Sequence, residues 1–223
     1  METTVDTDTE QRLRQVRAAR AQLARDGPVR LRPVANDFAR VALPATDSDI
    51  LRDALIAERA RTVIEVGLAY ASSALAIGEA LLSCHESEGS HLVIDPFQAT
   101  SYANAGWDAV RAAGLEQSTT LITEPASLAL PRLLAAGFVA DAAFVDGSHR
   151  FHEVFVDLYY LRKLVRPGGL IILDDAEWPA VAAALRYGDL NLGWQRVRLP
   201  GRLQARRLPA EPFEPEFTDF KPF

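Results

Sequence analysis

From residue 61 onward, short apolar runs alternate with longer stretches in which apolar residues recur at helical spacing. This alternation is typical of βαβ units, which build a parallel sheet covered by helices. The predicted strands are 62–66, 91–94, 119–122, 142–145 and 170–173. The predicted helices that follow them are 72–82, 107–114, 128–136, 151–165 and 179–187. The pattern therefore indicates an α/β fold with a Rossmann-like, doubly wound and mostly parallel sheet.

The C-terminal part of the pattern predicts an antiparallel hairpin. Residues 194–199 and 202–208 flank Pro200-Gly201, a typical turn sequence. The arginines of this segment alternate with apolar residues, so we interpret them as the solvated face of a strand pair. They are Arg196, Arg198, Arg202, Arg206 and Arg207. Upstream, the Arg-Pro-Gly-Gly run at 166–169 is predicted to stop the long helix before the fifth strand.

Two helices are predicted before the first strand. Residues 1–30 form an Arg-rich amphipathic pattern that could pack on the domain or on a second subunit. The run Thr46-Asp47-Ser48-Asp49 offers N-capping side chains for the second helix. We divide the chain into an N-terminal helical segment packing on the core (1–58), a ligand-binding domain (59–210) and a tail rich in proline and phenylalanine (211–223). The tail has no period, which leaves disorder and docking of its rings equally open.

Composition narrows the function classes. A chain of 223 residues has room for one sizeable core, and its 48% hydrophobic content, 24% charged content and mean hydropathy of −0.02 are ordinary for a globular domain. Neither a membrane-spanning run nor a signal-peptide pattern is present, so we expect a cytoplasmic protein without a membrane partner. The net charge of −6 argues against a nucleic-acid partner. Cys84, the single cysteine, cannot form an internal disulfide and is interpreted as a small apolar filler.

Several predicted strands end in polar residues, and ligands of open α/β sheets bind at that edge. The first strand continues as Glu65-Val-Gly67-Leu-Ala69-Tyr-Ala71-Ser-Ser73. This turn has a single glycine, whereas a dinucleotide pyrophosphate needs the close backbone approach of GxGxxG, so a dinucleotide is disfavoured. Asp95, after the second strand, is placed to accept hydrogen bonds from a ribose diol.

Glu65-Val66-Gly67 resembles the first motif of class I S-adenosylmethionine-dependent methyltransferases, written E/D-x-G-x-G-x-G. The resemblance implies that Glu65 and Gly67 hold the amino-acid end of S-adenosylmethionine and that Asp95 holds its ribose. The chain departs from the motif at Ala69 and Ala71, where alanine penalises a positive φ and puts cofactor affinity in question. The full set of expected cofactor-binding residues is Glu65, Gly67, Ala69, Ser73, Asp95, Ser127 and Asp146. Among them Ser127, in the loop after the third strand, is expected near adenine.

Three acids are predicted at the ends of neighbouring strands. Asp146 follows the fourth strand, and Asp174 and Asp175 follow the fifth. Like charges gathered in a cleft repel unless a cation or altered protonation compensates them, and an all-oxygen ligand set suits Mg²⁺. Helix capping is the structural alternative, with Asp146 capping the helix that begins near Phe151; capping would explain only one of the other two acids.

The layout D-G-x-H, helix, P-G-G, strand, D-D, within about residues 60–180, resembles the metal-dependent O-methyltransferases, particularly the bacterial branch acting on hydroxyls of sugars and other natural products. The resemblance implies a Mg²⁺ held by Asp146, Asp174 and Asp175 and a catalytic base at His149. The chemistry is coherent, since a histidine can accept a hydroxyl proton near neutral pH. Taken alone, His149 would sooner be interpreted as a helix-start residue bonded to a backbone carbonyl. His152 is expected to point elsewhere.

The leading hypothesis is thus a Mg²⁺-assisted S-adenosylmethionine-dependent O-methyltransferase acting on a small hydroxylated molecule, such as a natural product, a sugar or a catechol-like compound. A metal-independent methyltransferase and a cofactor-binding module without catalysis are the alternatives. A nicotinamide oxidoreductase is disfavoured by the turn. The sequence leaves the oligomeric state open, with a homodimer as the commonest case for soluble enzymes.

Overall fold

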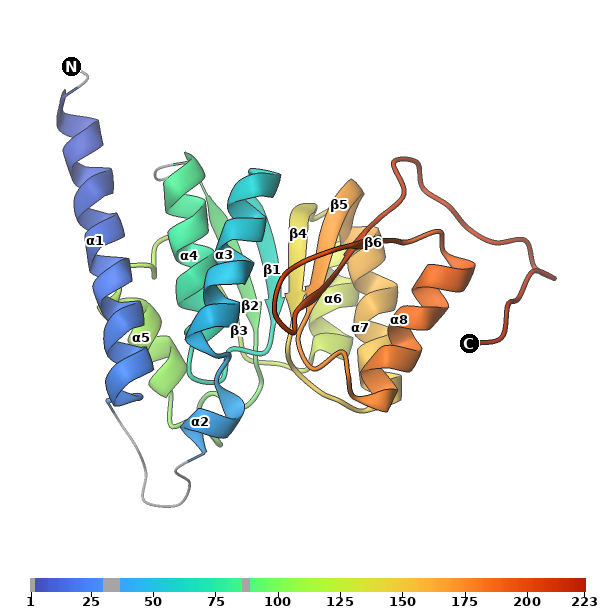
Figure 1. The fold of residues 1–223 in the computed structure, drawn as a ribbon, viewed down its shortest axis with the longest axis horizontal. Helices are drawn as coiled ribbons and strands as arrows, with labels where there is room; N and C mark the ends of the chain where they lie inside the picture. The colour runs from blue at the N-terminus through green and yellow to red at the C-terminus, as the bar shows by residue number, and fades with distance from the viewer. Residues whose placement is uncertain (1–2, 30–36, 86–88) are drawn as a thin grey trace.

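The computed structural model describes residues 3–29, 37–85 and 89–223. Its centre is a sheet of seven strands in the order β3-β2-β1-β4-β5-β7-β6 (Figure 1). The strands are β1 (Thr62–Val66), β2 (Ser90–Ile94), β3 (Thr119–Ile122), β4 (Ala140–Val145), β5 (Val165–Leu173), β6 (Gln195–Val197) and β7 (Gln204–Arg207). Strands β1 to β5 pair in parallel, whereas β7 runs antiparallel to both β5 and β6. The predicted mostly parallel α/β sheet with a C-terminal antiparallel hairpin is confirmed.

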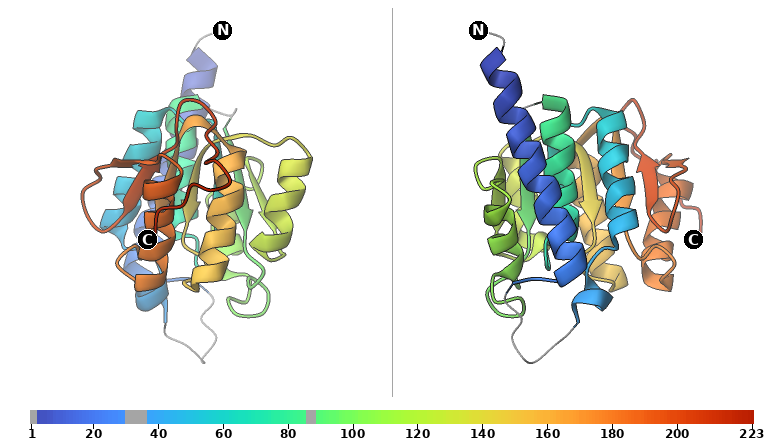
Figure 2. Two further views of the ribbon diagram at one scale, coloured as in Figure 1. Left: turned by 90° about the vertical axis from the view of Figure 1, so that its right-hand side faces the viewer. Right: turned by 60° about the vertical axis from the view of Figure 1, so that its left-hand side comes forward.

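Helices cover both faces of the sheet (Figures 1 and 2). They are α1 (Thr3–Asp26), α2 (Phe38–Val41), α3 (Ala45–Glu58), α4 (Ser72–His85), α5 (Ala105–Ala112), α6 (Ala126–Ala135), α7 (Phe151–Leu164) and α8 (Pro179–Asn191). The first, third and fourth helices lie on one face, and α6, α7 and α8 lie on the other. Within the described residues, no helix is long and apolar enough to cross a membrane.

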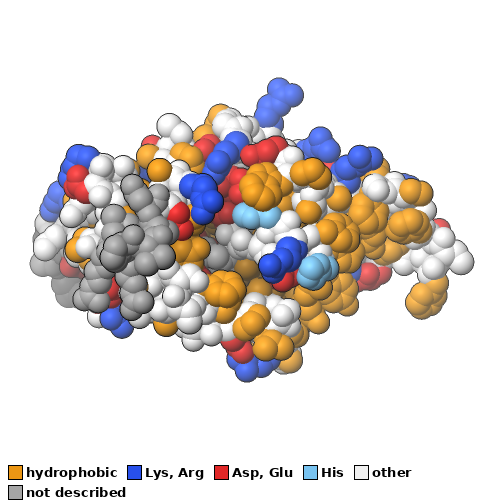
Figure 3. Space-filling view, turned by 90° about the horizontal axis from the view of Figure 1, so that it is seen from below, with side chains coloured by type: hydrophobic (Ala, Val, Ile, Leu, Met, Phe, Trp, Pro, Cys, Tyr) orange, Lys and Arg blue, Asp and Glu red, His pale blue; other side chains and the backbone are white. Residues whose placement is uncertain are grey.

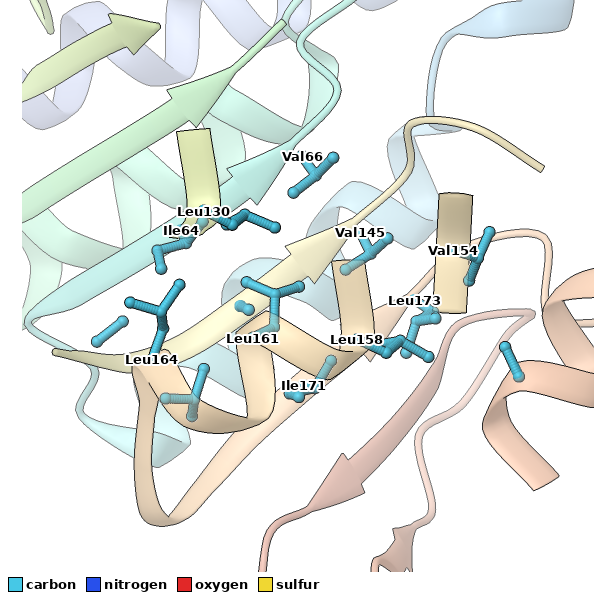
Figure 4. Close-up of a cluster of buried hydrophobic side chains, with 14 of the residues drawn as sticks. Ile64, Val66, Leu130, Val145, Val154, Leu158, Leu161, Leu164, Ile171 and Leu173 are labelled. Atoms are coloured by element: carbon cyan, nitrogen blue, oxygen red, sulfur yellow. The ribbon is translucent and has the colours of Figure 1, made fainter. Parts of the chain in front are cut away.

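Helix α7 shows why this sequence forms these layers. Val154, Leu158, Leu161 and Leu164 recur at helical spacing, so they project from one side of the helix. Figure 4 shows them directed at strand side chains of β1, β4 and β5. All four are at most 4% exposed. Burying a side chain of this size contributes about 1.5–3 kcal/mol, so this face alone anchors α7 over the parallel strands.

The opposite face is built in the same way from α3 and α4. Leu51 and Leu55 of α3 and Ile77 of α4 are buried against Val63 of β1 and Phe144 of β4. Because alternate residues of a strand face opposite sides, Phe144 faces these helices while Val145 faces α7. The strands are therefore buried on both faces, as expected of a parallel sheet between two helical layers.

The predicted N-terminal helix is present as α1 and lies against α4 (Figure 2). Its Val16 is fully buried. Glu79 of α4, only 2% exposed, accepts hydrogen bonds from both Arg17 and Arg20 of α1. A buried carboxylate needs such partners, so the arginines predicted on this helix tie it to the core. The prediction of a segment 1–58 also covers residues 1–2 and 30–36, which lie outside the described residues.

The predicted starts of the second helix and of the fifth strand were wrong. Helix α3 begins at Ala45 with Pro44 as its N-cap residue, so the predicted capping run 46–49 lies inside the first turn and makes no capping hydrogen bond. Helix α7 ends before the run 166–169, as predicted, but that run already belongs to β5, which starts at Val165. Its backbone is held by the chain beyond β7: Gly168 N–H donates to Pro209 O at 2.9 Å, and Leu208 N–H donates to Gly169 O at 3.0 Å. Those partners come from a distant segment, which explains why local sequence misplaced the strand.

The arginines of the C-terminal hairpin do not form one solvated face. Arg196 and Arg198 are exposed, as predicted, but Arg206 is only 2% exposed. Its guanidinium contacts both carboxylate oxygens of Asp189 on α8, with Nε–Oδ1 at 2.5 Å and Nη2–Oδ2 at 3.1 Å. The Arg206 guanidinium can be buried because the carboxylate of Asp189 accepts two of its hydrogen bonds.

The tail after residue 210 has no regular structure, but it is attached to the helical layer of α7 and α8. Lys221 exchanges two hydrogen bonds with Asn191, through its N–H at 2.7 Å and its carbonyl at 2.9 Å. The ring of Phe223 lies 5.3 Å from that of Tyr187 and 6.1 Å from that of Phe151. Of the two alternatives for the tail, the structure shows docking on the domain.

The Arg206–Asp189 pair yields a stability prediction. Arg206→Ala leaves Asp189 without its buried partner and should lower the free energy of unfolding by about 3 kcal/mol. Arg196→Ala is the matched control, since Arg196 pairs with the same carboxylate but is 71% exposed; it should cost less than about 1 kcal/mol. Urea unfolding of both variants measures the difference, and equal losses would contradict the assignment.

Candidate active site

The loops that follow β1, β4 and β5 lie side by side at the carboxyl edge of the parallel strands (Figure 1). Pairing continues to the strand ends, because Asp146 N–H donates to Val66 O at 2.9 Å and Asp174 N–H donates to Val145 O at 3.1 Å. Figure 3 views this edge from below and shows acidic and histidine side chains next to each other near the middle of the face. The edge is therefore where the predicted site residues meet.

Gly67 allows the first and fourth loops to touch. Its φ is +98°, and a Cβ built there would lie 2.2 Å from the carbonyl oxygen of Asp146. No side chain fits in that space, so glycine is required both for its conformation and for the close approach. Gly67 was predicted to hold the amino-acid end of the cofactor through its backbone, and that role stays a prediction. The contact with Asp146 requires a glycine at this position.

After Gly67, the turn has left-handed backbone at the two positions where the motif has its second and third glycines. Ala69 and Ala71 have φ values of +44° and +71°, in the left-handed region that alanine disfavours. Their positive φ values confirm the conformational penalty that was predicted for alanine at these positions, whereas its effect on cofactor affinity stays a prediction.

Asp95 is the main support of the strained turn. Its Oδ2 accepts hydrogen bonds from Leu68 N–H at 3.1 Å, Ala69 N–H at 3.0 Å and the Gln98 side-chain amide at 2.8 Å. Its Oδ1 accepts one from Phe97 N–H at 2.7 Å. The side chain is only 3% exposed. The predicted contact of Asp95 with a ribose remains a prediction. The structure shows that this carboxylate holds the backbone of the turn through hydrogen bonds.

Glu65 lies beneath the same turn. It is fully buried, accepts a hydrogen bond from the Ser73 hydroxyl, and has Oε2 2.9 Å from Nε2 of His91. His91, given no role by the sequence, is 1% exposed. Both Glu65 and Ser73 were predicted to bind the cofactor. In this structure they are buried and hydrogen-bonded to each other.

Ser127 does not lie in a loop, as the sequence predicted. Helix α6 begins at Ala126, so Ser127 stands in its first turn, where it is exposed. Pro125 is the N-cap residue, so the helix starts earlier than the apolar pattern indicated.

The three predicted acids are crowded together. Burial, followed by the charges of Asp174, Asp175 and Glu65, raises the pKa of Asp146 well above its ordinary value. Burial also raises the pKa of Asp174. The backbone at Asp175 is itself strained, with φ of +49°. Charge crowding and strain in one place are features of a functional site rather than of a stabilising one.

His149 lies at the centre of this cluster. Its Nε2 is 2.7 Å from Asp175 Oδ2 and 4.0 Å from Asp146 Oδ1. The Trp178 ring, 49% exposed, covers the imidazole with a centroid separation of 4.6 Å. His152 is 3.8 Å from Glu153 and its side chain is 76% exposed, so it points elsewhere, as predicted.

The capping alternative for these acids was wrong. The N-cap residue of α7 is Arg150 and that of α8 is Trp178, and neither helix has a side-chain capping hydrogen bond. Asp146 therefore does not cap the helix near Phe151, and the structure leaves the acids without that explanation.

The predicted metal-binding trio is only partly assembled. Asp146, His149 and Asp175 offer ligand atoms within 4.8 Å of one another, whereas Asp174 turns its Oδ2 to the guanidinium of Arg202. The other oxygen, Asp174 Oδ1, is buried and has no hydrogen-bond partner among the described residues. The residue Asp174 lines a small cavity together with Asp146 and His149. The donors suit an oxygen-seeking cation, and a buried carboxylate oxygen without a partner is a group that such an ion would satisfy.

Three residues of the site were missed from sequence. Gln98 is fully buried, with its amide donating to Ala69 O at 2.9 Å as well as to Asp95. Trp178 and Arg202 frame His149 and Asp174. A tryptophan three residues after the acidic pair was the only local signal, because the other two act through contacts between distant segments.

Comparison with known proteins supports this placement. A family model described as "Methyltransferase domain" matches residues 64–176, which include the turn and all three acids. No curated protein sequence matches the chain.

Solved structures with a similar fold include Rv0187 from MTB, crystallised with cofactor, at 20% identity, a TM-score of 0.64 and 90% coverage of both chains. Another is the O-methyltransferase TomG of Streptomyces achromogenes, involved in tomaymycin synthesis and crystallised with S-adenosylmethionine, at 18% identity, a TM-score of 0.63 and 89% coverage of both chains. A third is CalS11, a TDP-rhamnose 3'-O-methyltransferase of calicheamicin biosynthesis, at 19% identity, a TM-score of 0.59, and coverage of 93% of this chain and 96% of that one. At these identities the likeness is one of fold.

The strained turn leads to a prediction about stability. Ala69→Gly relieves a positive φ and should raise the free energy of unfolding by about 0.5–1 kcal/mol, since the left-handed conformation costs alanine more than the flexibility of glycine does. Ala71→Gly is the matched comparison: its methyl group is fully buried, and the loss of about 0.8 kcal/mol of burial should cancel the gain. Chemical denaturation distinguishes the two, and a less stable Ala69→Gly variant would refute the strain argument.

The raised pKa of Asp146 predicts a pH dependence. The folded state holds this proton more tightly than the unfolded state, so ionisation costs stability as pH rises above about 4, the ordinary pKa of aspartate. Asp146→Asn cannot ionise, and in EDTA its stability advantage over the wild type should grow between pH 4 and pH 8 by on the order of 1 kcal/mol or more. Asp219→Asn, at an exposed position, should show no such trend. Urea unfolding at several pH values provides the test, and a constant difference would count against crowding at Asp146.

Proposed function

Because the chain belongs to the methyltransferase-domain family and is an S-adenosylmethionine-dependent methyltransferase, we propose that it methylates a hydroxyl group of a small molecule, with His149 as general base and a Mg²⁺ ion assisting at the acidic cluster. The observation that carries the proposal is the position of the imidazole. Its Nε2 lies between the carboxylates of Asp175 and Asp146, next to the loop that contacts Gly67.

S-adenosylmethionine supplies an electrophilic methyl group on sulfur, so the acceptor must present a nucleophilic oxygen. His149 is placed to accept the hydroxyl proton as that oxygen attacks. The imidazolium formed would be stabilised by Asp175 at 2.7 Å and by Asp146 at 4.0 Å. Asp175 also restrains the ring on one side while Trp178 restrains it on the other, which limits the orientations of the base.

The acidic cluster fits a divalent cation through its oxygen donors. When bound, Mg²⁺ would lower the pKa of a hydroxyl that it contacts. Asp146 and Asp175 would hold it together with the unpartnered Oδ1 of Asp174. Burial and then like-charge repulsion raise the pKa of Asp146, and the same ion would offset the repulsion.

The acceptor is proposed to be small and at least partly apolar. The exposed ring of Trp178 lies over His149, and a flat or sugar-like ring could pack against it next to the base. The structural relatives are consistent with this class, since CalS11 is named for a TDP-rhamnose hydroxyl and TomG for tomaymycin synthesis.

The test is methyl transfer to a panel of hydroxyl acceptors, including nucleotide sugars and catechols, by the wild type and by His149→Gln. Loss of the base should lower kcat by about 10²- to 10⁴-fold while leaving the Kd for S-adenosylhomocysteine unchanged. His152→Gln is the matched control, because it removes an exposed imidazole three residues away and should leave kcat unchanged. A wild-type rate in the His149→Gln variant would show that His149 is not the general base.

Two alternatives give different results in the same assay. Activity that survives both EDTA and Asp175→Ala would favour a metal-independent methyltransferase. Binding of S-adenosylhomocysteine by calorimetry without transfer to any acceptor would favour a cofactor-binding module.

A further inference from the structure

Arg202 is the one cationic side chain that the described residues place in contact with the acidic cluster. It follows the Pro200-Gly201 turn between β6 and β7, and β7 pairs with β5, which is followed by Asp174 and Asp175. Its Nη2 donates to Asp174 Oδ2, and its Nε lies 3.6 Å from Asp47 Oδ2 on α3. The guanidinium therefore bridges the acidic cluster and the N-terminal helical layer.

The backbone around Arg202 is held closely against α3. Gly201 has φ of +71°, and a Cβ added there would lie 2.5 Å from Asp47 Oδ1 and 2.8 Å from Ile50 Cδ1. Arg202 N–H also donates to Asp47 Oδ1 at 3.4 Å. Asp47 itself is 7% exposed. The side chain is thus presented by a packed turn rather than by a free surface loop.

The contact with Arg202 occupies only one of the two carboxylate oxygens of Asp174. Asp174 is 3% exposed, with Oδ2 on Arg202 and Oδ1 buried without a hydrogen-bond partner among the described residues. The residue lines a small cavity together with Asp146 and His149. Three ionised carboxylates carry a charge that one guanidinium compensates only in part. A divalent cation would supply what remains when His149 is neutral. The charge of Arg202 and the charge of the cation therefore act on the same carboxylates.

We propose that Arg202 is a positioning residue that serves as the counter-charge of Asp174 when no cation is bound, and that it thereby weakens the binding of the divalent cation. This inference rests on the cation site of the proposed function. Both partners draw on Asp174, and two positive charges close together repel, so the guanidinium and the cation are negatively coupled. With partial solvent screening, removal of one positive charge at this range should strengthen cation binding by about tenfold.

The test is the Kd of Mn²⁺, measured by electron paramagnetic resonance in the presence of S-adenosylhomocysteine, for the wild type and Arg202→Gln. We expect a Kd about tenfold lower in Arg202→Gln. Arg198→Gln, an exposed arginine of the same hairpin, is the matched control and should match the wild type within twofold. Arg202→Lys keeps the charge and should bind close to the wild-type value. If Arg202→Gln does not fold, Arg202→Met keeps the aliphatic stem and carries the same expectation.

Thermal unfolding gives a second readout that activity does not influence. In EDTA, Arg202→Gln should have a lower Tm than Arg198→Gln, because Asp174 loses its counter-charge. Added Mn²⁺ should raise the Tm of Arg202→Gln by more than that of the wild type.

Equal or weaker Mn²⁺ binding in the neutral variants would overturn the inference while leaving the proposed function in place. Absence of Mn²⁺ binding to the wild type and to every variant would instead refute the cation site itself, and the inference with it. Methyl transfer measured in EDTA then shows whether the transferase part of the proposed function survives.

Discussion

The parallel pairing of β1, β4 and β5 up to their last residues is the constraint on which the rest of this structure depends. Val66 is in register with Val145, and Val145 with Leu173, so the three following loops start at one level. Gly67 then lies against the carbonyl of Asp146. Slipping one strand by a residue would turn its buried side chains to the wrong layer, so core packing maintains the alignment that the site requires.

That alignment has an electrostatic consequence. Neighbouring loops that begin with Asp146 and Asp174 must bring carboxylates together, and burial makes their repulsion stronger than it would be in water. The structure offsets it with Arg202 on one side and His149 on the other. The strained backbone at Asp175 also lowers stability at the place where the charged groups converge.

The turn after β1 shows a second compromise. Alanine occupies two left-handed positions where glycine would be relaxed, and the conformation persists because Asp95 and Gln98 bind the turn backbone. Ala71 also gains burial from its methyl group. The two alanines therefore raise the conformational energy of the turn. Hydrogen bonds to Asp95, at the end of β2, and from Gln98, in the following loop, hold its backbone in place.

The sequence by itself determined the layers, the parallel strands and the convergence of the loops that carry Asp146, Asp174 and Asp175, since these follow from local periodicity and from the rule that parallel strands end at one edge. Only the tertiary structure placed His149 with Asp146 and Asp175. Only the tertiary structure decided that Asp174 pairs with Arg202, that Asp95 and Glu65 support the turn from below, and that Arg206 is buried on Asp189. It also decided the start of β5, whose hydrogen-bond partners lie some 40 residues further along the chain. The physical reason is the same in each case. Periodicity reports which side of an element faces the core, whereas the partner of a charged side chain or of a free backbone group depends on which distant segment packs against it.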